Sequence, residues 1–385
     1  MKILMAENLV WNDSVRVGSH HIARQFLDHG HELFWISLPW TPAHLIGGLK
    51  SERIRQWNWG TPLRPDHNLW TWCPLTPLPY RNHLILRNYG LGRTLLRRSL
   101  PSVRSVLKAA GFSKVDLLWI TDPRMLSIRE LVDFRASAYR CVDQMNAFSD
   151  VPPSVDKLER ELVGSSTVVF ATAEDLLNKL REWRQDLEFL PNAADIDHFR
   201  VPAPEPQPLK AIARPRVLYV GALGEWFDTE LLRALAERMP DVSFVIVGPK
   251  RRSLHEIEGV SNILLLGPQP YTSIPGYMQH CDTAIIPFTA SALSRAVNPI
   301  KLYEYLAAGV PVVCSDLPEV TRSGLPVRIA TGAEQFEAAI REAFRLNAGE
   351  RTGLAQSVEK YSWKSRFEQV AATLKSQSNL ELITA

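Results

Sequence analysis

Apolar runs alternate with amphipathic stretches twice along the chain, and this alternation constrains the fold more than any other feature. In the first half, six short apolar runs are typical of buried strands: residues 3–6, 32–37, 116–120, 138–142, 167–171 and 188–190. Between the first two lies an amphipathic stretch, residues 19–28, which ends at Gly30 as a helix with a glycine C-cap would. Alternating strands and helices predict a parallel sheet covered by helices on both faces.

A proline-rich segment interrupts the alternation before it restarts. Residues 201–215 contain five prolines and few apolar side chains, which is typical of a linker. A chain of 385 residues suits two domains. We therefore predict domains at 1–200 and 216–360, a linker at 201–215 and a helical tail, 361–385, that crosses back to the N-terminal domain. After the linker, strand-like runs alternate with helical stretches: strands 217–220, 243–247, 262–265, 283–287 and 311–314, and helices 229–238, 300–308, 333–346 and 363–374.

Each predicted domain is an open, doubly wound α/β sheet. Open parallel sheets bind ligands at the carboxyl ends of their strands. We expect two Rossmann-like domains whose loops face each other across a cleft, each holding one ligand. No run approaches the roughly 18 apolar residues of a membrane-spanning helix, and Glu7 comes too early for a signal peptide. We therefore expect a cytoplasmic protein, whose four separate cysteines are buried thiols rather than zinc ligands or disulfides.

One segment combines a helix start with a pair of charged residues. Asn298 and Pro299 precede a helical stretch, a glycine turn and a buried strand. The N-terminus of a helix offers free N–H groups and a positive dipole end, which favour a diphosphate. Lys301 adds a cation there, and Glu304, three residues on, lies on the same side and suits the two hydroxyls of a ribose. The same spacing also suits an ordinary surface Lys–Glu pair.

An ordered set of segments resembles the donor domain of GT-B-fold glycosyltransferases, especially the group 1, family 4-like enzymes of bacterial polysaccharide synthesis. The matching segments are LPNAADIDHF at 190–199, YVGALGEWFD at 219–228, FVIVGP at 244–249, the stretch 262–271 and the stretch 298–319. The resemblance covers most of 191–374 and implies the GT-B fold. It also implies a nucleotide-sugar site formed by Gly221, Leu223, Gly224, Tyr271, Asn298, Lys301 and Glu304.

The sequence departs from the family at one glutamate. Retaining members carry two glutamates seven residues apart; Glu304 matches the second, and Val297 stands in place of the first. Lys301 is also similar to the phosphate-binding lysine of an inverting group that includes the xanthan glucuronosyltransferase. That group places a general base after a Y-R-x-x-D strand, which matches Asp143 here. The resemblance makes Asp143 the candidate base, and a loop-starting Asp that binds its own backbone is the alternative.

Two histidines begin the first predicted helix, after a loop that carries Trp11 and Asn12. Gly18 permits close backbone approach, and the helix N-terminus is expected to point into the cleft. Many family members have a His or Gln here, so His20 and His21 are candidate catalytic residues near the acceptor. A histidine packed in the core is the alternative. The Trp11 ring and the Asn12 amide suit contacts with a sugar.

We predict no metal ion and no resident cofactor. Asp195 and Asp197 come closest to a metal-binding pair, but they lie in the hinge segment rather than on a donor loop. A helix N-terminus with Lys301, and with Arg295 nearby, can neutralise a diphosphate instead. The co-substrate is expected to be a UDP- or GDP-linked sugar.

The charge is unevenly distributed, although its sum is only +3. The segment Arg81–Lys108 has seven basic residues and no acidic one, and five tryptophans lie before it in residues 40–72. Pro101 is expected to divide the segment into two helices. This composition favours docking on an anionic membrane surface, whereas a solvated basic helix face is the alternative. On a helical wheel four of the cations form one narrow stripe: Arg93, Arg97, Arg104 and Lys108.

We expect a glycosyltransferase that moves a sugar from a nucleoside diphosphate sugar to a hydroxyl of a glycan or lipid-linked acceptor. Cell-surface polysaccharide or glycolipid synthesis at the inner face of the membrane is the expected setting. Two alternatives stay open. A nucleotide-sugar epimerase of the same architecture would leave the basic segment without a role. A nucleic-acid-binding protein would carry a helix-turn-helix or RNA-recognition motif, which this sequence lacks, so we expect no nucleic-acid partner.

Overall fold

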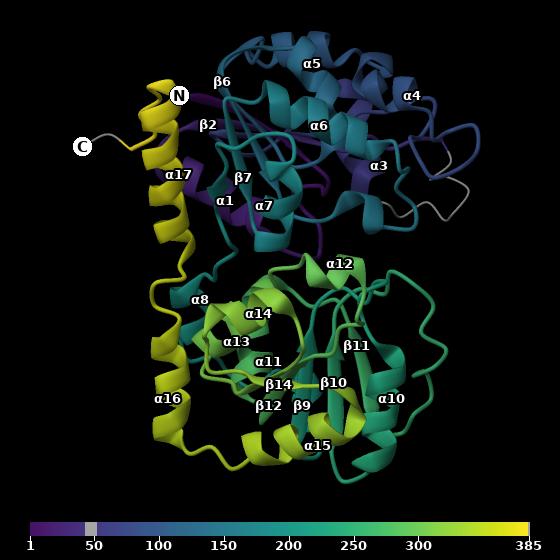
Figure 1. Ribbon diagram of the computed structural model, residues 1–385, viewed down its shortest axis with the longest axis vertical. Helices are drawn as coiled ribbons and strands as arrows, with labels where there is room; N and C mark the ends of the chain where they lie inside the picture. Colours follow the sequence, from purple (N-terminus) through teal and green to yellow (C-terminus); the bar gives the residue numbers. More distant parts are fainter. Residues whose placement is uncertain (43–51, 384–385) are drawn as a thin grey trace. The chain divides into compact units, whose positions relative to one another are not determined.

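The computed structural model describes residues 1–42 and 52–383, and the chain forms two compact α/β units (Figure 1). Unit 1 comprises Met1–Asp13, Ser19–Pro191 and Phe367–Ala385, whereas unit 2 comprises Ser14–Gly18 and Asn192–Arg366. The last helix therefore begins in unit 2 and ends in unit 1. A short piece of the N-terminal loop also belongs to unit 2.

Unit 1 is built on an eight-stranded sheet of order β3-β4-β2-β1-β5-β6-β7-β8. The strands run parallel, except that β3 is antiparallel to β4. The order reverses beside β1, which pairs with both β2 and β5, and such a reversal is where open sheets bind ligands. The strands are β1 (Lys2–Glu7), β2 (Glu32–Ser37), β3 (Leu63–Asp66), β4 (Leu69–Trp72), β5 (Lys114–Ile120), β6 (Asp133–Cys141), β7 (Val168–Ala171) and β8 (Glu188–Phe189).

Helices cover the sheet of unit 1. In the last one, α17, Phe367 packs edge-on against Phe26 of α1 with ring centroids 5.2 Å apart. The side chain of Gln369 donates to the carbonyl of Phe189, 2.7 Å away, and so ties α17 to the end of β8. The helices are α1 (Gly18–Asp28), α3 (Glu52–Trp57), α4 (Tyr89–Arg93), α5 (Val103–Ala109), α6 (Val155–Ser165), α7 (Glu174–Arg181) and α17 (Trp363–Ser378), with 3-10 turns η1 (Asn58–Gly60), η2 (Leu95–Arg98), η3 (Pro123–Glu130) and η4 (Met145–Ala147).

Unit 2 is built on a six-stranded parallel sheet of order β11-β10-β9-β12-β13-β14, the doubly wound order with its reversal between β9 and β12. Its strands are β9 (Arg216–Val220), β10 (Ser243–Val247), β11 (Ile263–Gly267), β12 (Thr283–Ile286), β13 (Val312–Ser315) and β14 (Arg328–Ala330). Its helices are α8 (Ile196–Arg200), α9 (Gln207–Lys210), α10 (Thr229–Arg238), α11 (Ile274–Gln279), α12 (Ala292–Arg295), α13 (Ile300–Ala307), α14 (Pro318–Ser323), α15 (Gly332–Ala343) and α16 (Ala348–Ser357), with the 3-10 turn η5 (Tyr271–Ser273).

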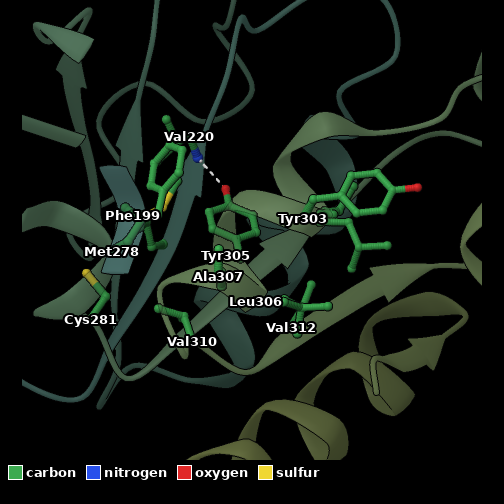
Figure 2. Packing of buried hydrophobic residues seen from close by; sticks show 14 of the residues in the cluster. Phe199, Val220, Met278, Cys281, Tyr303, Tyr305, Leu306, Ala307, Val310 and Val312 are labelled. Carbon is green, nitrogen blue, oxygen red and sulfur yellow. Dashed lines mark hydrogen bonds between the residues drawn. The ribbon is translucent and has the colours of Figure 1, made fainter. Parts of the chain in front are cut away.

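Side chains of unit 2 alternate between two cores, one on each face of the sheet. Along β9, Val217 and Tyr219 pack with α10 and α15, whereas Leu218 and Val220 pack with α8, α11 and α13. This alternation follows from the two-residue period of a strand, and it requires both faces to be apolar. Figure 2 shows the second core, where the Val220 amide donates to the Tyr305 hydroxyl at 2.7 Å. That bond fixes the C-terminal half of α13 against the carboxyl end of β9.

The predicted α/β class with two parallel, doubly wound sheets is confirmed. Helix α10 and strand β10 have the predicted bounds, and the other predicted strands agree within a few residues. Strands β3, β4 and β14 were not predicted. Strands β3 and β14 lie at sheet edges, and β4 lies in a tryptophan-rich stretch without clear alternation of polar and apolar residues. In such segments pairing with a neighbouring strand decides the conformation.

The proline-rich segment 201–215 is part of unit 2 rather than the junction between the units. The side chain of Gln279, on α11, donates to the carbonyls of Phe199 and Val201 and accepts from the amide of Ala203, all at 2.9 Å. The prolines thus lie against a helix. Apart from the short piece Ser14–Gly18, the chain passes between the units at Pro191 and again within α17.

The basic segment does not form two helices with a cationic stripe, and this expectation is corrected. It is divided into α4, η2 and α5. Arg93 pairs with Glu130 at 2.7 Å and with Glu161 at 2.8 Å, and Arg97 also pairs with Glu130. Arg104 donates to the backbone carbonyl of Glu130 at 2.7 Å. Acids from η3 and α6, distant in sequence, therefore neutralise much of the predicted stripe. Within residues 1–42 and 52–383, no helix is long and apolar enough to cross a bilayer.

Candidate functional site

A pocket opens in unit 2 at the carboxyl ends of β9, β10 and β11. Each strand contributes the residues that directly follow it or end it, and Lys301 contributes from the first turn of α13. This position is where doubly wound sheets bind ligands. The lining residues, all of unit 2, are Ser14, Val15, Arg16, Val220, Gly221, Val247, Gly248, Pro249, Pro268, Gln269, Tyr271, Ile274 and Lys301.

Glycines form the floor of this pocket because no side chain fits there. Gly248 has φ of +149°, and a Cβ at this position would overlap the carbonyl oxygen of Gly221. A Cβ on Gly221 would in turn lie 2.7 Å from the hydroxyl of Tyr219. The bare backbone lets a ligand approach the strand ends closely.

Lys301 lines the pocket and pairs with Glu304, which is not itself among the lining residues. The ammonium of Lys301 donates to Oε2 of Glu304 at 2.5 Å, one turn further along α13. The Glu304 side chain is 0% exposed, and among the described residues its Oε1 has no hydrogen-bond partner. The pair therefore presents one cation for an anion and one carboxylate oxygen that can accept from a hydroxyl.

Tyr271 and Arg16 complete the lining on the other side. The ring of Tyr271 stacks on His198 with centroids 4.4 Å apart and planes 9° from parallel. Burial raises the pKa of the Tyr271 hydroxyl, the negative charge of Glu304 adds to this effect, and the positive charge of Arg16 opposes it. Arg16 is therefore a second cation of this pocket. Arg16 was not predicted as a donor-site residue, because it lies far along the chain from the donor segments.

Of the predicted donor residues, Gly221, Tyr271 and Lys301 line the pocket, and Glu304 contacts Lys301. The remaining three lie outside the lining. Leu223 is buried in the core beside α10, and Gly224 lies against the ring of Trp226. The side chain of Asn298 accepts from the amide of Asn192, and its carbonyl accepts from the Asn192 side chain at 2.6 Å, so Asn298 ties the hinge segment to α13.

The hinge carboxylates lie at the start of α8. Asp195 caps α8 by accepting from the amide of His198 at 3.3 Å, and Asp197 lies in the first turn of that helix. Among the residues that the structure describes, no three His, Cys, Asp or Glu side chains gather around one point.

A second constellation lies in unit 1, at the carboxyl ends of three adjacent strands. Glu7 ends β1, Thr121 and Asp122 follow β5, and Asp143 follows β6. The Thr121 hydroxyl donates to Oε2 of Glu7. Asp122 accepts from the guanidinium of Arg124 at 2.6 and 2.9 Å, and both of these side chains are buried. Three carboxylates thus meet at the reversal of the sheet order, and Asp143 is partly exposed there.

The local environment raises the pKa of two of these carboxyls, Asp143 and Glu7. Burial raises the pKa of Asp143 to about 6, the negative charge of Asp122 adds to this, and the buried guanidinium of Arg140 opposes it. Burial also raises the pKa of Glu7 to about 8, against hydrogen bonds from Thr121 and Ser19. A carboxyl with a pKa near 6 is mostly ionised at neutral pH and is more basic than an ordinary aspartate, which suits a general base.

Glu7→Gln is expected to change how stability depends on pH. Glu7 loses its proton near pH 4.5 in the unfolded chain but near pH 8 in the folded protein. The folded state therefore binds the extra proton between these values, and the free energy of unfolding falls as pH rises through this window. The variant lacks this fall, so above pH 8 its Tm should exceed that of the wild type. A difference in Tm that is the same at pH 5 and at pH 9 would contradict the assignment.

The two candidate histidines differ in their surroundings. His20 is buried between aromatic rings, with its centroid 4.8 Å from Trp35 and 5.6 Å from Trp11. Trp11 is itself buried, so its predicted role as a sugar-stacking surface is corrected: the ring packs against Trp35 and His20 instead. His21 is partly buried and Asn12 is exposed. His20 thus matches the alternative of a packed core histidine.

A buried polar network holds the strand that precedes Asp143. Glu159, on α6, accepts from the Tyr139 hydroxyl at 2.6 Å and from the ammonium of Lys179 at 2.8 Å. Lys179 also binds Asp156 at 3.0 Å. Since Asp156 accepts from Asn146 in the loop after β6, the network fixes both ends of the segment that carries Asp143.

Comparisons with known proteins agree with this geometry. The family described as glycosyl transferases group 1 matches residues 214–345, which lie in unit 2. Unit 2 is thus similar to a group 1 glycosyltransferase domain. The chain is 26% identical over 247 residues to the putative teichuronic acid biosynthesis glycosyltransferase TuaH of Bacillus subtilis (strain 168). That match covers 59% of this chain and 62% of TuaH, so it spans less than two thirds of the relative's length.

Superposition on solved structures shows that the chain as a whole has the GT-B fold. Sucrose-phosphate synthase from Thermosynechococcus elongatus superposes with a TM-score of 0.70 at 15% identity, covering 97% of this chain and 98% of that one. HepE of Anabaena, in complex with UDP and glucose, superposes with a TM-score of 0.68 at 16% identity, covering 98% and 100%. At these identities the likeness concerns the fold alone.

Proposed function

We propose that this protein transfers a sugar from a nucleoside diphosphate sugar, bound in unit 2, to a hydroxyl of an acceptor bound at unit 1. The observation that carries the proposal is the pocket at the ends of β9, β10 and β11, where Lys301 and Arg16 flank a glycine floor. Two cations suit a diphosphate, and the Oε1 atom of Glu304 suits a ribose hydroxyl. The group 1 match over this unit favours transfer over the epimerase alternative.

In the proposed reaction, Asp143 takes the proton of the acceptor hydroxyl as its oxygen forms a bond to the anomeric carbon of the sugar. The bond from that carbon to the diphosphate breaks, and the nucleoside diphosphate leaves with the electron pair. Lys301 and Arg16 stabilise the charge that develops on it, so the reaction needs no metal ion. Attack from the side opposite the leaving group inverts the anomeric centre, which accords with Val297 at the position of the missing glutamate.

The acceptor and setting are part of the same proposal. The similarity to TuaH favours cell-surface polysaccharide synthesis, and we propose a glycan or lipid-linked acceptor and a hexose as the transferred sugar. We infer that the protein works at the inner face of the membrane.

Calorimetry with UDP and GDP, each with and without excess chelator, tests the donor site. We expect one of the nucleotides to bind in both conditions. Arg16→Ala should weaken that binding about tenfold or more, because a charge-assisted hydrogen bond is lost. Arg233→Ala, an exposed arginine on α10 whose partner is Glu237, is the matched control and should bind like the wild type. If neither nucleotide binds, the donor site is wrong; if binding or turnover needs a divalent ion, metal independence is wrong.

A further inference from the structure

Two large apolar side chains lie at the tip of the loop that leads into α4. Leu84 is 78% exposed and Ile85 is 80% exposed, although most large apolar residues of the described chain are buried. Both belong to the turn 83–87, which we call the apolar tip. Exposed aliphatic side chains at adjacent positions favour a surface that removes them from water.

The apolar tip is held in a defined conformation. The carbonyl of His83 accepts from the amides of Leu86 and Arg87 at 2.8 and 2.9 Å, which closes the turn. Before the turn, the amide and side chain of Asn82 donate to the carbonyls of Asp150 and Ser149 at 2.9 and 3.1 Å.

After the turn, the Ser154 hydroxyl donates to the carbonyl of Arg87 at 2.6 Å. The apolar tip is thus anchored to the same neighbouring segment on both sides. These hydrogen bonds hold the turn in a conformation that exposes Leu84 and Ile85 to solvent. Their exposure is therefore explained best by contact with a partner surface.

The sequence around the apolar tip is basic. No acidic residue occurs between Asp66 and Asp116 in the sequence. Arg87 and Arg98 are exposed and, within the described chain, neither forms an ion pair with a carboxylate. Asp150 brings one acid to the base of the loop. The unpaired cations, rather than the neutralised Arg93 and Arg97, remain available to an anionic partner.

We propose that the apolar tip inserts Leu84 and Ile85 into an anionic lipid surface, with Arg87 and Arg98 at the level of the headgroups. Peripheral proteins bind bilayers by inserting apolar side chains at the boundary of the acyl chains, while nearby cations contact acidic headgroups. A protein partner would need a broad interface, whereas two residues on a narrow turn suit a fluid surface that closes around them. The inference rests on the proposed function, which places the acceptor at a membrane.

Co-sedimentation of the full chain with phosphatidylcholine vesicles, with and without phosphatidylglycerol, tests the apolar tip. We expect the wild type to bind only the anionic vesicles. Leu84→Ser/Ile85→Ser should lower the partition coefficient at least about tenfold at unchanged salt. Arg87→Ser/Arg98→Ser should lower it by a similar factor and reduce its dependence on salt. Val201→Ser, an exposed apolar residue of unit 2, is the matched control and should bind as the wild type does.

Vesicle binding by the Leu84→Ser/Ile85→Ser variant at the wild-type level, or no binding by the wild type, would overturn the proposal. Sedimentation velocity adds a second check: a concentration-dependent dimer that this variant abolishes would make the apolar tip an interface between copies instead. Nucleotide binding by calorimetry is independent of the apolar tip and should be equal in wild type and variant. A chain that binds vesicles through the apolar tip but binds no nucleotide would refute the proposed function and leave this inference standing.

Discussion

Asp143→Asn is expected to lower kcat by about 10²–10⁴-fold while the Kd for the donor stays unchanged, because a positioned general base contributes about that factor. Asparagine keeps the size of the side chain but cannot take the proton of the acceptor. The matched control is Asp133→Asn, at the opposite end of β6, where the side chain is exposed. That variant should turn over at the wild-type rate.

The pH profile gives an independent readout of the same residue. The pKa of Asp143 is about 6, so the base is protonated below this pH and the wild-type rate should rise as pH increases through 6. In Asp143→Asn this limb should disappear. Near-normal turnover in the variant, or a product that keeps the anomeric configuration of the donor when examined by proton NMR, would end the base hypothesis.

Stability separates this role from a purely structural one. Because the pKa of Asp143 is higher in the folded protein than in the unfolded chain, its ionised form destabilises the folded state above pH 6. Asp143→Asn should therefore melt at or above the wild-type Tm at pH 8. A loop-starting Asp that binds its own backbone predicts the opposite, a lower Tm with a small kinetic effect.

Lys301→Ala is expected to weaken nucleoside diphosphate binding by about ten- to a hundredfold, because the pocket loses a charge-assisted hydrogen bond to the diphosphate. The same change should lower the free energy of unfolding by about 3–5 kcal/mol, because the fully buried Glu304 then lacks its partner. Calorimetry and denaturant unfolding measure the two effects separately.

A double variant distinguishes binding from stability in this pair. In Lys301→Ala/Glu304→Gln no unpaired carboxylate remains, so the free energy of unfolding should return toward the wild-type value while nucleotide binding stays weak. Lys250→Ala removes an exposed lysine after β10 that pairs with Glu258, and it should change neither property. If Lys301→Ala binds the nucleotide with wild-type affinity, Lys301 and Glu304 form only a structural pair.

Part of the candidate site follows from local sequence. Gly221 lies directly after a predicted strand and Lys301 at a predicted helix start, whereas Tyr271 was predicted from the family resemblance of the stretch 262–271; the sheet order brings these positions to one pocket. Asp143 likewise follows a predicted strand, and its role as base stays a prediction. Leu223 and His20 lie in comparable segments, yet the structure packs both into cores, because one-residue differences in position decide which side chain faces inward.

The sequence by itself determined the two α/β halves and the edge of each sheet where ligands bind, because strand and helix periodicities are local and recur in order. Only the tertiary structure decided which distant groups meet. It brought Arg16 into the pocket of unit 2, and it paired Arg93 and Arg97 with Glu130, which neutralises part of the predicted cationic stripe. Such contacts depend on long-range packing, and the pKa values of the groups involved depend on burial. Neither produces a periodic pattern in the sequence from which it could be predicted.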